Sequence, residues 1–151
     1  MEILIDKIRI TICFLFLLME GWSDRKKKRI HLIPVAIFGL AGICLCAFQG
    51  PKDIAYAFFG MVPGAMVLLL AYATGEKIGY GDGFVLMATG VLLGFRMNLL
   101  MMLFGVFLAS LSGIWILIRK KGNRKTKIPF VPYLIPGLTL TLAMVLQGNE
   151  I

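Results

Sequence analysis

The sequence predicts an all-α, polytopic membrane protein with six transmembrane helices and with both termini outside. Of the 151 residues, 59% are hydrophobic and only 16% are charged, whereas a soluble domain is nearer half apolar and about a quarter charged. The apolar residues are gathered into long blocks, and the basic residues are concentrated between those blocks. Residues 1–151 are therefore expected to form a single membrane-embedded domain, with no room for a separate soluble one.

Six apolar blocks follow one another along the chain. They run over approximately residues 8–22, 30–48, 54–73, 83–95, 98–118 and 128–146. Glu20 makes the first block the weakest, and Gln49-Gly50-Pro51 ends the second. Several blocks are shorter than the ~20 residues that cross a bilayer comfortably. Tilt or local thinning of the membrane can accommodate that shortfall.

The basic residues predict the orientation of these spans. If the N-terminus is outside, the loops 24–29, 74–82 and 119–127 lie inside and hold twelve Lys or Arg, against four in the outside segments. Cytoplasmic loops carry such an excess, which favours six spans over five or seven. The run Arg25–Arg29 is expected to lie against anionic lipid. Beside membrane spans, basic runs more often set topology than bind nucleic acid.

Two acidic residues lie on the same predicted face of the membrane. Asp24 ends the first block, and Asp82 lies in Gly79-Tyr80-Gly81-Asp82-Gly83, directly ahead of the fourth. A carboxylate this close to lipid is costly, so each is a candidate for a functional site. Each also has a plain explanation on its own. Gly-Asp-Gly is often a turn with a helix cap, and an acid beside five bases is often a charge balance.

Together, the two carboxylates would suit peptide hydrolysis. The ionised one takes a proton from water, while the protonated one polarises the scissile carbonyl. Asp82 is a candidate N-cap whose helix dipole favours the ionised form, which points to Asp24 as the proton carrier. The sequence alone leaves that assignment open. Gly79, Gly81 and Gly83 allow positive φ and close backbone approach, so a glycine-rich strand could hold an extended substrate.

Three motifs occur in order over almost the whole chain. Gly79-Tyr80-Gly81-Asp82 is followed by Gly90 and Gly94, which gives the pattern GxGD-x7-G-x3-G. Ser23-Asp24-Arg25 precedes the basic stretch to Arg29, and Ile128-Pro129-Phe130-Val131-Pro132-Tyr133-Leu134 follows near the C-terminus. These motifs resemble those of the type IV prepilin peptidases, the bacterial GxGD aspartyl proteases, whose third segment reads IPF-x-P-[FY]-L.

The resemblance implies a membrane aspartyl endopeptidase in the inner (plasma) membrane. It would remove the short basic leader from prepilin or preflagellin precursors at the cytoplasmic face. Asp24 and Asp82 would be catalytic, Pro129, Phe130 and Pro132 would help to shape the site, and no cofactor or metal is implied. The partners would be pilin-like precursors, with a basic leader and a hydrophobic helix, and membrane lipid.

The chain departs from the family's usual pattern at two positions. Ile30-His31-Leu32 stands where the family commonly has Ile-Pro-Asn, and Phe84 stands where a Lys is common. Both departures bear on substrate preference more than on chemistry. The chain lacks the methyltransferase insert with paired CxxC motifs that larger members carry, so N-methylation is not expected.

Glu20 and two other classes of function also bear on this interpretation. Glu20 lies one helical turn before Asp24 and could attract the basic leader, or it could be a snorkelling interfacial acid. A small proton- or cation-coupled transporter is the main alternative function, but its acids would be expected deeper in their spans. A scaffold with incidental acids would tolerate Asp82→Asn. The chain's three cysteines and single histidine do not predict a zinc site.

Overall fold

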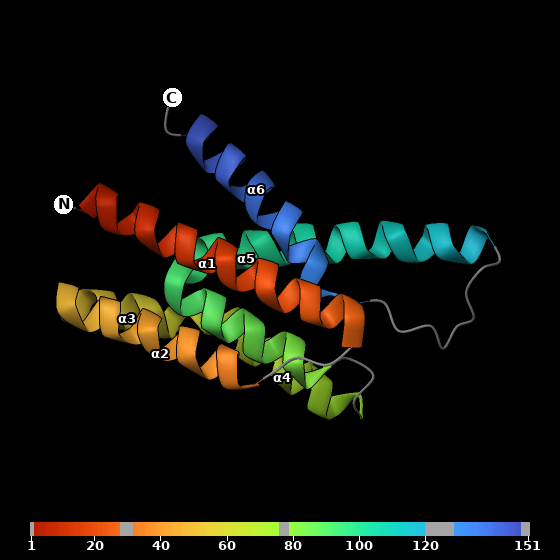
Figure 1. Ribbon diagram of the computed structural model, residues 1–151, viewed down its shortest axis with the longest axis horizontal. Coiled ribbons are helices and arrows are strands. Elements are labelled where there is room, and N and C mark those ends of the chain that lie inside the picture. The colour runs from red at the N-terminus through yellow and green to blue at the C-terminus, as the bar shows by residue number, and fades with distance from the viewer. Residues whose placement is uncertain (1, 28–31, 76–78, 120–128, 149–151) are drawn as a thin grey trace.

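The structure is a computed structural model that describes residues 2–27, 32–75, 79–119 and 129–148. All regular structure within these ranges is helical (Figure 1). The helices are α1 (Glu2–Lys27), α2 (Leu32–Gln49), α3 (Pro51–Gly60), α4 (Val62–Ala73), α5 (Tyr80–Ile118) and α6 (Val131–Gly148). The all-α expectation is confirmed for these residues.

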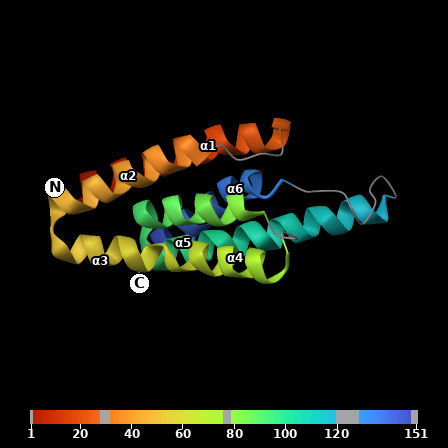
Figure 2. The same cartoon turned by 90° about the horizontal axis from the view of Figure 1, so that it is seen from below.

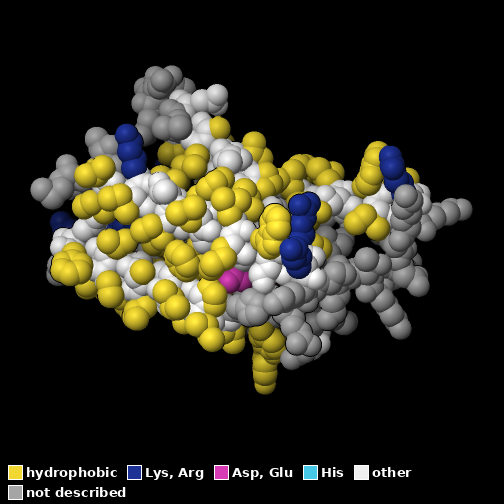
Figure 3. All heavy atoms as spheres, viewed as in Figure 1, with side chains coloured by type: hydrophobic (Ala, Val, Ile, Leu, Met, Phe, Trp, Pro, Cys, Tyr) yellow, Lys and Arg dark blue, Asp and Glu magenta, His cyan; other side chains and the backbone are white. Residues whose placement is uncertain are grey.

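Among the described residues, three helical segments are long and apolar enough to cross a membrane. They are Leu32–Gln49, Lys52–Ala73 and Tyr80–Ile116, and Val131–Val145 is a shorter apolar helix. Large apolar side chains cover much of the surface in Figure 3, which suits contact with lipid. These features indicate a multi-pass membrane protein. The count of six spans and their orientation stay predictions.

The first helix presents one continuous face to the rest of the bundle. Its buried residues recur at helical spacing: Arg9, Cys13, Phe16, Leu17, Glu20, Gly21 and Asp24. The apolar members of this set belong to the main hydrophobic core, together with residues from α2, α5 and α6. The buried face of α1 is thus apolar in its middle and carries a charged residue near each end.

The longest helix, α5, reverses its direction at Gly94. The φ and ψ of Gly94 are 72° and 175°, a conformation that favours glycine. Figure 2 shows the two parts of α5 running back past each other, and we call residues 80–93 the first arm and residues 95–118 the second arm. The hydroxyl of Tyr56 donates to the Leu93 carbonyl at 3.0 Å and so satisfies an acceptor beside the reversal. The fourth and fifth predicted blocks are therefore separate helices, as expected.

Glycines let α3 and α4 pack closely against the first arm of α5. A Cβ on either Gly60 or Gly90 would overlap the carbonyl of the other, so these two backbones touch. One turn further on, a Cβ on Gly64 would overlap the backbone of Met87. Small residues allow helices to approach this closely within a membrane, where dispersion contacts replace the hydrophobic effect.

A buried polar network joins the two arms of α5 to the end of α3. The Asn98 side-chain amide donates to the carbonyls of Gly60 at 3.0 Å and of Leu86 at 2.9 Å. The Thr89 hydroxyl lies 2.9 Å from the Asn98 side-chain oxygen, and both side chains are fully buried. Each member of this network has a hydrogen-bond partner, as a buried polar group requires.

Asn98→Leu is expected to lower the free energy of unfolding by roughly 1–3 kcal/mol, because two backbone carbonyls lose their donor in an apolar interior. Thermal unfolding in detergent would measure the change. Ser110→Ala is the matched control, because its exposed hydroxyl bonds only to Val106 of the same helix, at 2.8 Å. Equal melting temperatures for the two variants would contradict the structural role of the network.

Candidate active site

Asp24 lies near the end of α1 and receives a hydrogen bond from the start of α6. The Val131 backbone N–H donates to Asp24 Oδ2 at 3.3 Å, and the Asp24 residue is only 6% exposed. Val131 is the first residue of α6. The first N–H groups of a helix have no intrahelical partner and lie at the positive end of its dipole, so they favour a carboxylate there.

The sequence around Val131 explains why its N–H is available. Pro132 has no N–H, and the N–H of Tyr133 donates to the Phe130 carbonyl at 2.9 Å. Proline is favoured in the first turn of a helix because its fixed φ suits that position. Val131 belongs to the C-terminal motif segment, but its contact with Asp24 could not be predicted from side-chain patterns, because it is made by the backbone. The flanking prolines were the available signal.

Asp82 lies in the first turn of α5. The expectation that it caps this helix is wrong, because α5 begins two residues earlier, at Tyr80. The Asp82 N–H donates to the Gly79 carbonyl at 3.2 Å. Its side chain turns back over the same residue, so that a Cβ on Gly79 would lie 3.3 Å from Asp82 Oδ2.

The two aspartates lie on helices that pack together, α1 and α5. Their carboxyl groups lie within electrostatic range of each other. The structure therefore brings two carboxylates near each other that come from the first and the second of the three motifs.

The predicted glycine-rich strand beside Asp82 is wrong. Gly81 and Gly83 lie within helix α5, and the glycines with positive φ in the described residues are Gly50, Gly75 and Gly94. A Cβ on Gly83 would lie 2.6 Å from Leu68 Cγ, so this glycine makes room for α4. The segment is helical because it leads directly into the fourth apolar block, residues 83–95, which has helical neighbours on which to pack.

Glu20 shares the buried face of α1 with Asp24, as its spacing predicted. It is 1% exposed, so the alternative of a snorkelling interfacial acid is wrong. A side chain this deeply buried would contact a precursor only after its neighbours moved. The next residue, Gly21, lies against α6, because a Cβ there would be 3.6 Å from Pro132 Cα.

The C-terminal segment lies where α1, α5 and α6 meet. Pro129, Phe130 and Pro132 are half-buried, and Phe130 packs against the main core. Ile128 lies outside the described residues, as do His31, Glu76 and most of the two basic runs. The segment thus places α6 against α1 at the height of Asp24.

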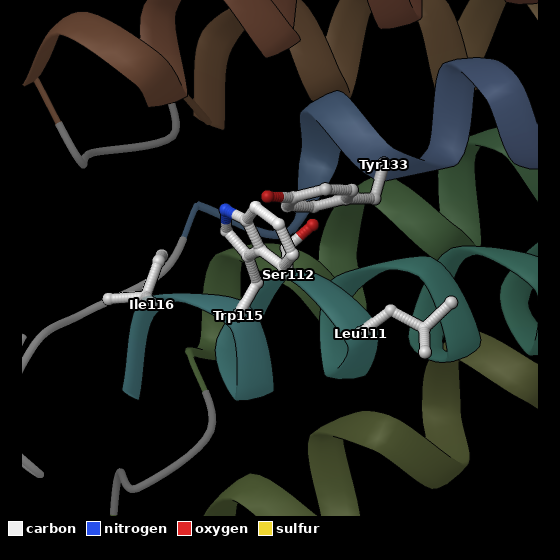
Figure 4. Close-up of a pocket in the computed structure, with 5 residues that line it drawn as sticks. All are labelled: Leu111, Ser112, Trp115, Ile116 and Tyr133. Atoms are coloured by element: carbon white, nitrogen blue, oxygen red, sulfur yellow. The ribbon is translucent and has the colours of Figure 1, made fainter. Parts of the chain in front are cut away.

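An open recess adjoins this end of α6. It is lined by Leu111, Ser112, Trp115, Ile116 and Tyr133. Figure 4 shows the side chains of Tyr133, from α6, and Trp115, from the second arm of α5, at this recess. In the described parts of the chain, no three His, Cys, Asp or Glu side chains gather closely enough to hold a metal ion.

Comparisons with known proteins identify a family. Residues 10–118 match the model of the type IV leader peptidase family, and this range contains both Asp24 and Asp82. No curated protein and no solved structure matches the chain. The family match agrees with the motifs around the two aspartates.

Proposed function

Because the chain belongs to the type IV leader peptidase family, we propose that it is an aspartyl endopeptidase that removes the basic leader from pilin-like precursors. Cleavage would take place at the cytoplasmic face of the inner membrane. The family supports a peptidase of the prepilin type. The site is assigned from one observation. Asp24, near the end of α1, and Asp82, near the start of α5, lie close to each other.

The geometry suggests a role for each carboxylate. Asp24 accepts the N–H of Val131 at the positive end of α6, an arrangement that favours an ionised carboxylate. Within the described ranges, no group donates a hydrogen bond to the Asp82 side chain. We therefore assign Asp24 as the base that takes a proton from water and Asp82 as the acid that polarises the scissile carbonyl. This order reverses the expectation from sequence.

The precursor would lie across the start of α5. Gly79 is exposed and leaves the backbone beside Asp82 uncovered. Gly81 is half-buried in the first turn of α5, whereas Gly83 contributes by packing on α4. Glu20 would draw the basic leader through its charge. Pro129, Phe130 and Pro132 would form the wall of the site nearest Asp24.

Cleavage by the purified protein in detergent tests the proposal. The substrate would be a pilin-like precursor with a basic leader, a glycine at the cut and an apolar helix. We expect cleavage at the leader boundary that a metal chelator does not change. Failure to cleave several such precursors, together with proton or cation uptake in proteoliposomes, would favour a transporter instead. The position of both aspartates at helix ends, not in the middle of a span, argues against that alternative.

Gly79→Ala is expected to lower kcat about tenfold with a smaller change in KM, because the new Cβ would press on the Asp82 carboxylate and misplace it. Gly79 does not have a positive φ, so the backbone accepts alanine. Gly21→Ala is the matched control, since its Cβ would also lie 3.3 Å from a neighbour, but that neighbour is the flexible methyl of Ile135. An equal fall in kcat for Gly79→Ala and Gly21→Ala would contradict a specific effect on Asp82.

A further inference from the structure

A second buried charge lies on the same face of α1 as Asp24. Arg9 is 5% exposed and lies fifteen residues before Asp24, which is ~22 Å along a helix. Its Nη2 donates to Cys46 Sγ at 3.3 Å and to Gln49 Oε1, and it lies 3.7 Å from Asp53 Oδ1. These partners come from the end of α2 and the start of α3. Arg9 thus ties α1 to the α2–α3 turn.

The turn is shaped to surround the guanidinium. Gly50 has a φ of 132° and joins α2 to α3, so that Gln49 and Asp53 both face α1. A charge inside a membrane protein is retained when it pairs within the bundle. Removing one partner of a buried pair is costly, because the other charge remains uncompensated. The position of α1 that forms this ion pair is therefore strongly preferred.

Between Arg9 and Glu20, the buried face of α1 is apolar. Cys13, Phe16 and Leu17 are fully buried in the main core. Such contacts are non-directional and tolerate small rotations and slips of a helix. Directed polar contacts, in contrast, fix register. On α1 they include the contact of Asp24 with Val131 at one end and those of Arg9 at the other.

We propose that Arg9 is a positioning residue that sets the rotation and axial register of α1, and that it thereby holds Asp24 against Asp82. The proposal rests on the proposed function only in naming Asp24 as catalytic. The placement of α1 by Arg9 stands on the contacts alone.

The contacts also predict which substitutions preserve this role. All three partners of Arg9 are reached by one terminal nitrogen, Nη2. A lysine ammonium is a single charged nitrogen on a slightly shorter stem, so Arg9→Lys should keep most of the positioning. Arg9→Met has a similar length without charge and should lose it. Asp53→Asn is a milder break of the same pair, because the Asp53 side chain is 36% exposed.

The first part of the test measures position without any peptidase assay. Spin labels at Arg25→Cys and Phe84→Cys report the distance between α1 and α5 beside the two aspartates, since both positions are exposed. The label variants would also carry Cys44→Ser, which removes the exposed native cysteine. Cys13 and Cys46 can stay, because both are buried and will not react with the label. We expect the same narrow distribution in the parent and in Arg9→Lys. In Arg9→Met it should shift or broaden on a scale between the ~1.5 Å rise of one residue and the ~5.4 Å of one turn.

The second part measures precursor cleavage. Arg9→Met should lower kcat about 10- to 100-fold with little change in KM, because misplacing a catalytic group costs rate more than binding. The kcat of Asp53→Asn should lie between those of Arg9→Met and the parent. The kcat of Arg9→Lys should be close to that of the parent. Lys7→Met is the control, since Lys7 is exposed on the same helix.

Two results would overturn the proposal. One is an unchanged label distance in Arg9→Met, even if that variant melts at a lower temperature, because Arg9 would then only stabilise the fold. The other is a kcat in Arg9→Met equal to that of Lys7→Met. If the parent protein cleaves no precursor, the proposed function fails, while the distance measurement still decides whether Arg9 positions α1.

Discussion

Asp82→Asn is expected to reduce the rate of precursor cleavage at least about a thousandfold, and Asp24→Asn should do the same. Asparagine keeps the shape of each side chain but neither gives nor takes a proton, so each variant removes half of the acid–base pair. The double variant should be no slower than either single one, because residues that act as a unit are not additive. The measurement is the initial rate of leader removal, followed by gel mobility and mass.

The control for this pair is Asp6→Asn, an exposed carboxylate on the same helix as Asp24. It should cleave at the rate of the parent. All variants should elute and melt as the parent does, which would show that the loss is chemical. A parental rate in Asp24→Asn or in Asp82→Asn would remove that aspartate from the mechanism.

Gly90→Ala should have the largest effect on stability, a loss of more than about 3 kcal/mol. The new Cβ would overlap the backbone of Gly60 and lie 2.7 Å from the Asn98 side-chain nitrogen. A backbone neighbour has no rotamer that could relieve the clash, so α3 would have to separate from the first arm of α5.

Gly39→Ala is the matched control for this prediction. Gly39 also lies inside a helix, but a Cβ there would meet only the Ala88 side chain, at 3.8 Å. Because alanine favours helix more than glycine does, this variant should be neutral or slightly stabilised. Thermal unfolding of both variants in detergent provides the comparison. Similar melting temperatures would show that the Gly60–Gly90 contact is not close in the native protein.

Much of the helical framework could be predicted from the sequence, because apolar blocks and their interruptions are local signals. The separation of the fourth and fifth blocks near Phe95 agrees with the reversal at Gly94. The buried face shared by Glu20 and Asp24 also followed from helical spacing. The first helix, however, continues to Lys27, beyond the apolar block that ends at Trp22, because packing extends a helix past its hydrophobic stretch.

The contacts that define the site could not be predicted in the same way. The hydrogen bond from Val131 to Asp24 joins residues 107 positions apart and uses a backbone N–H that no side-chain pattern marks. Arg9 was counted as an outside charge, and only the fold shows its partners on α2 and α3. The structure also gives the two motif glycines, Gly90 and Gly94, roles in packing and in a helix reversal.

The reversal at Gly94 has a consequence for how the chain enters the bilayer. If each arm spans the membrane, as the six-span prediction has it, two arms joined without an intervening loop must be inserted as a pair, because neither can stay in water while the other crosses. Hydrogen bonds within the hairpin support this step, because Asn98 of the second arm bonds to Leu86 and Thr89 of the first arm. Thr89 and Asn98 can thus be paired within the hairpin before any other helix arrives, as hydrocarbon demands. The bond from Asn98 to Gly60 can form later, when α3 docks on a hairpin already in the membrane.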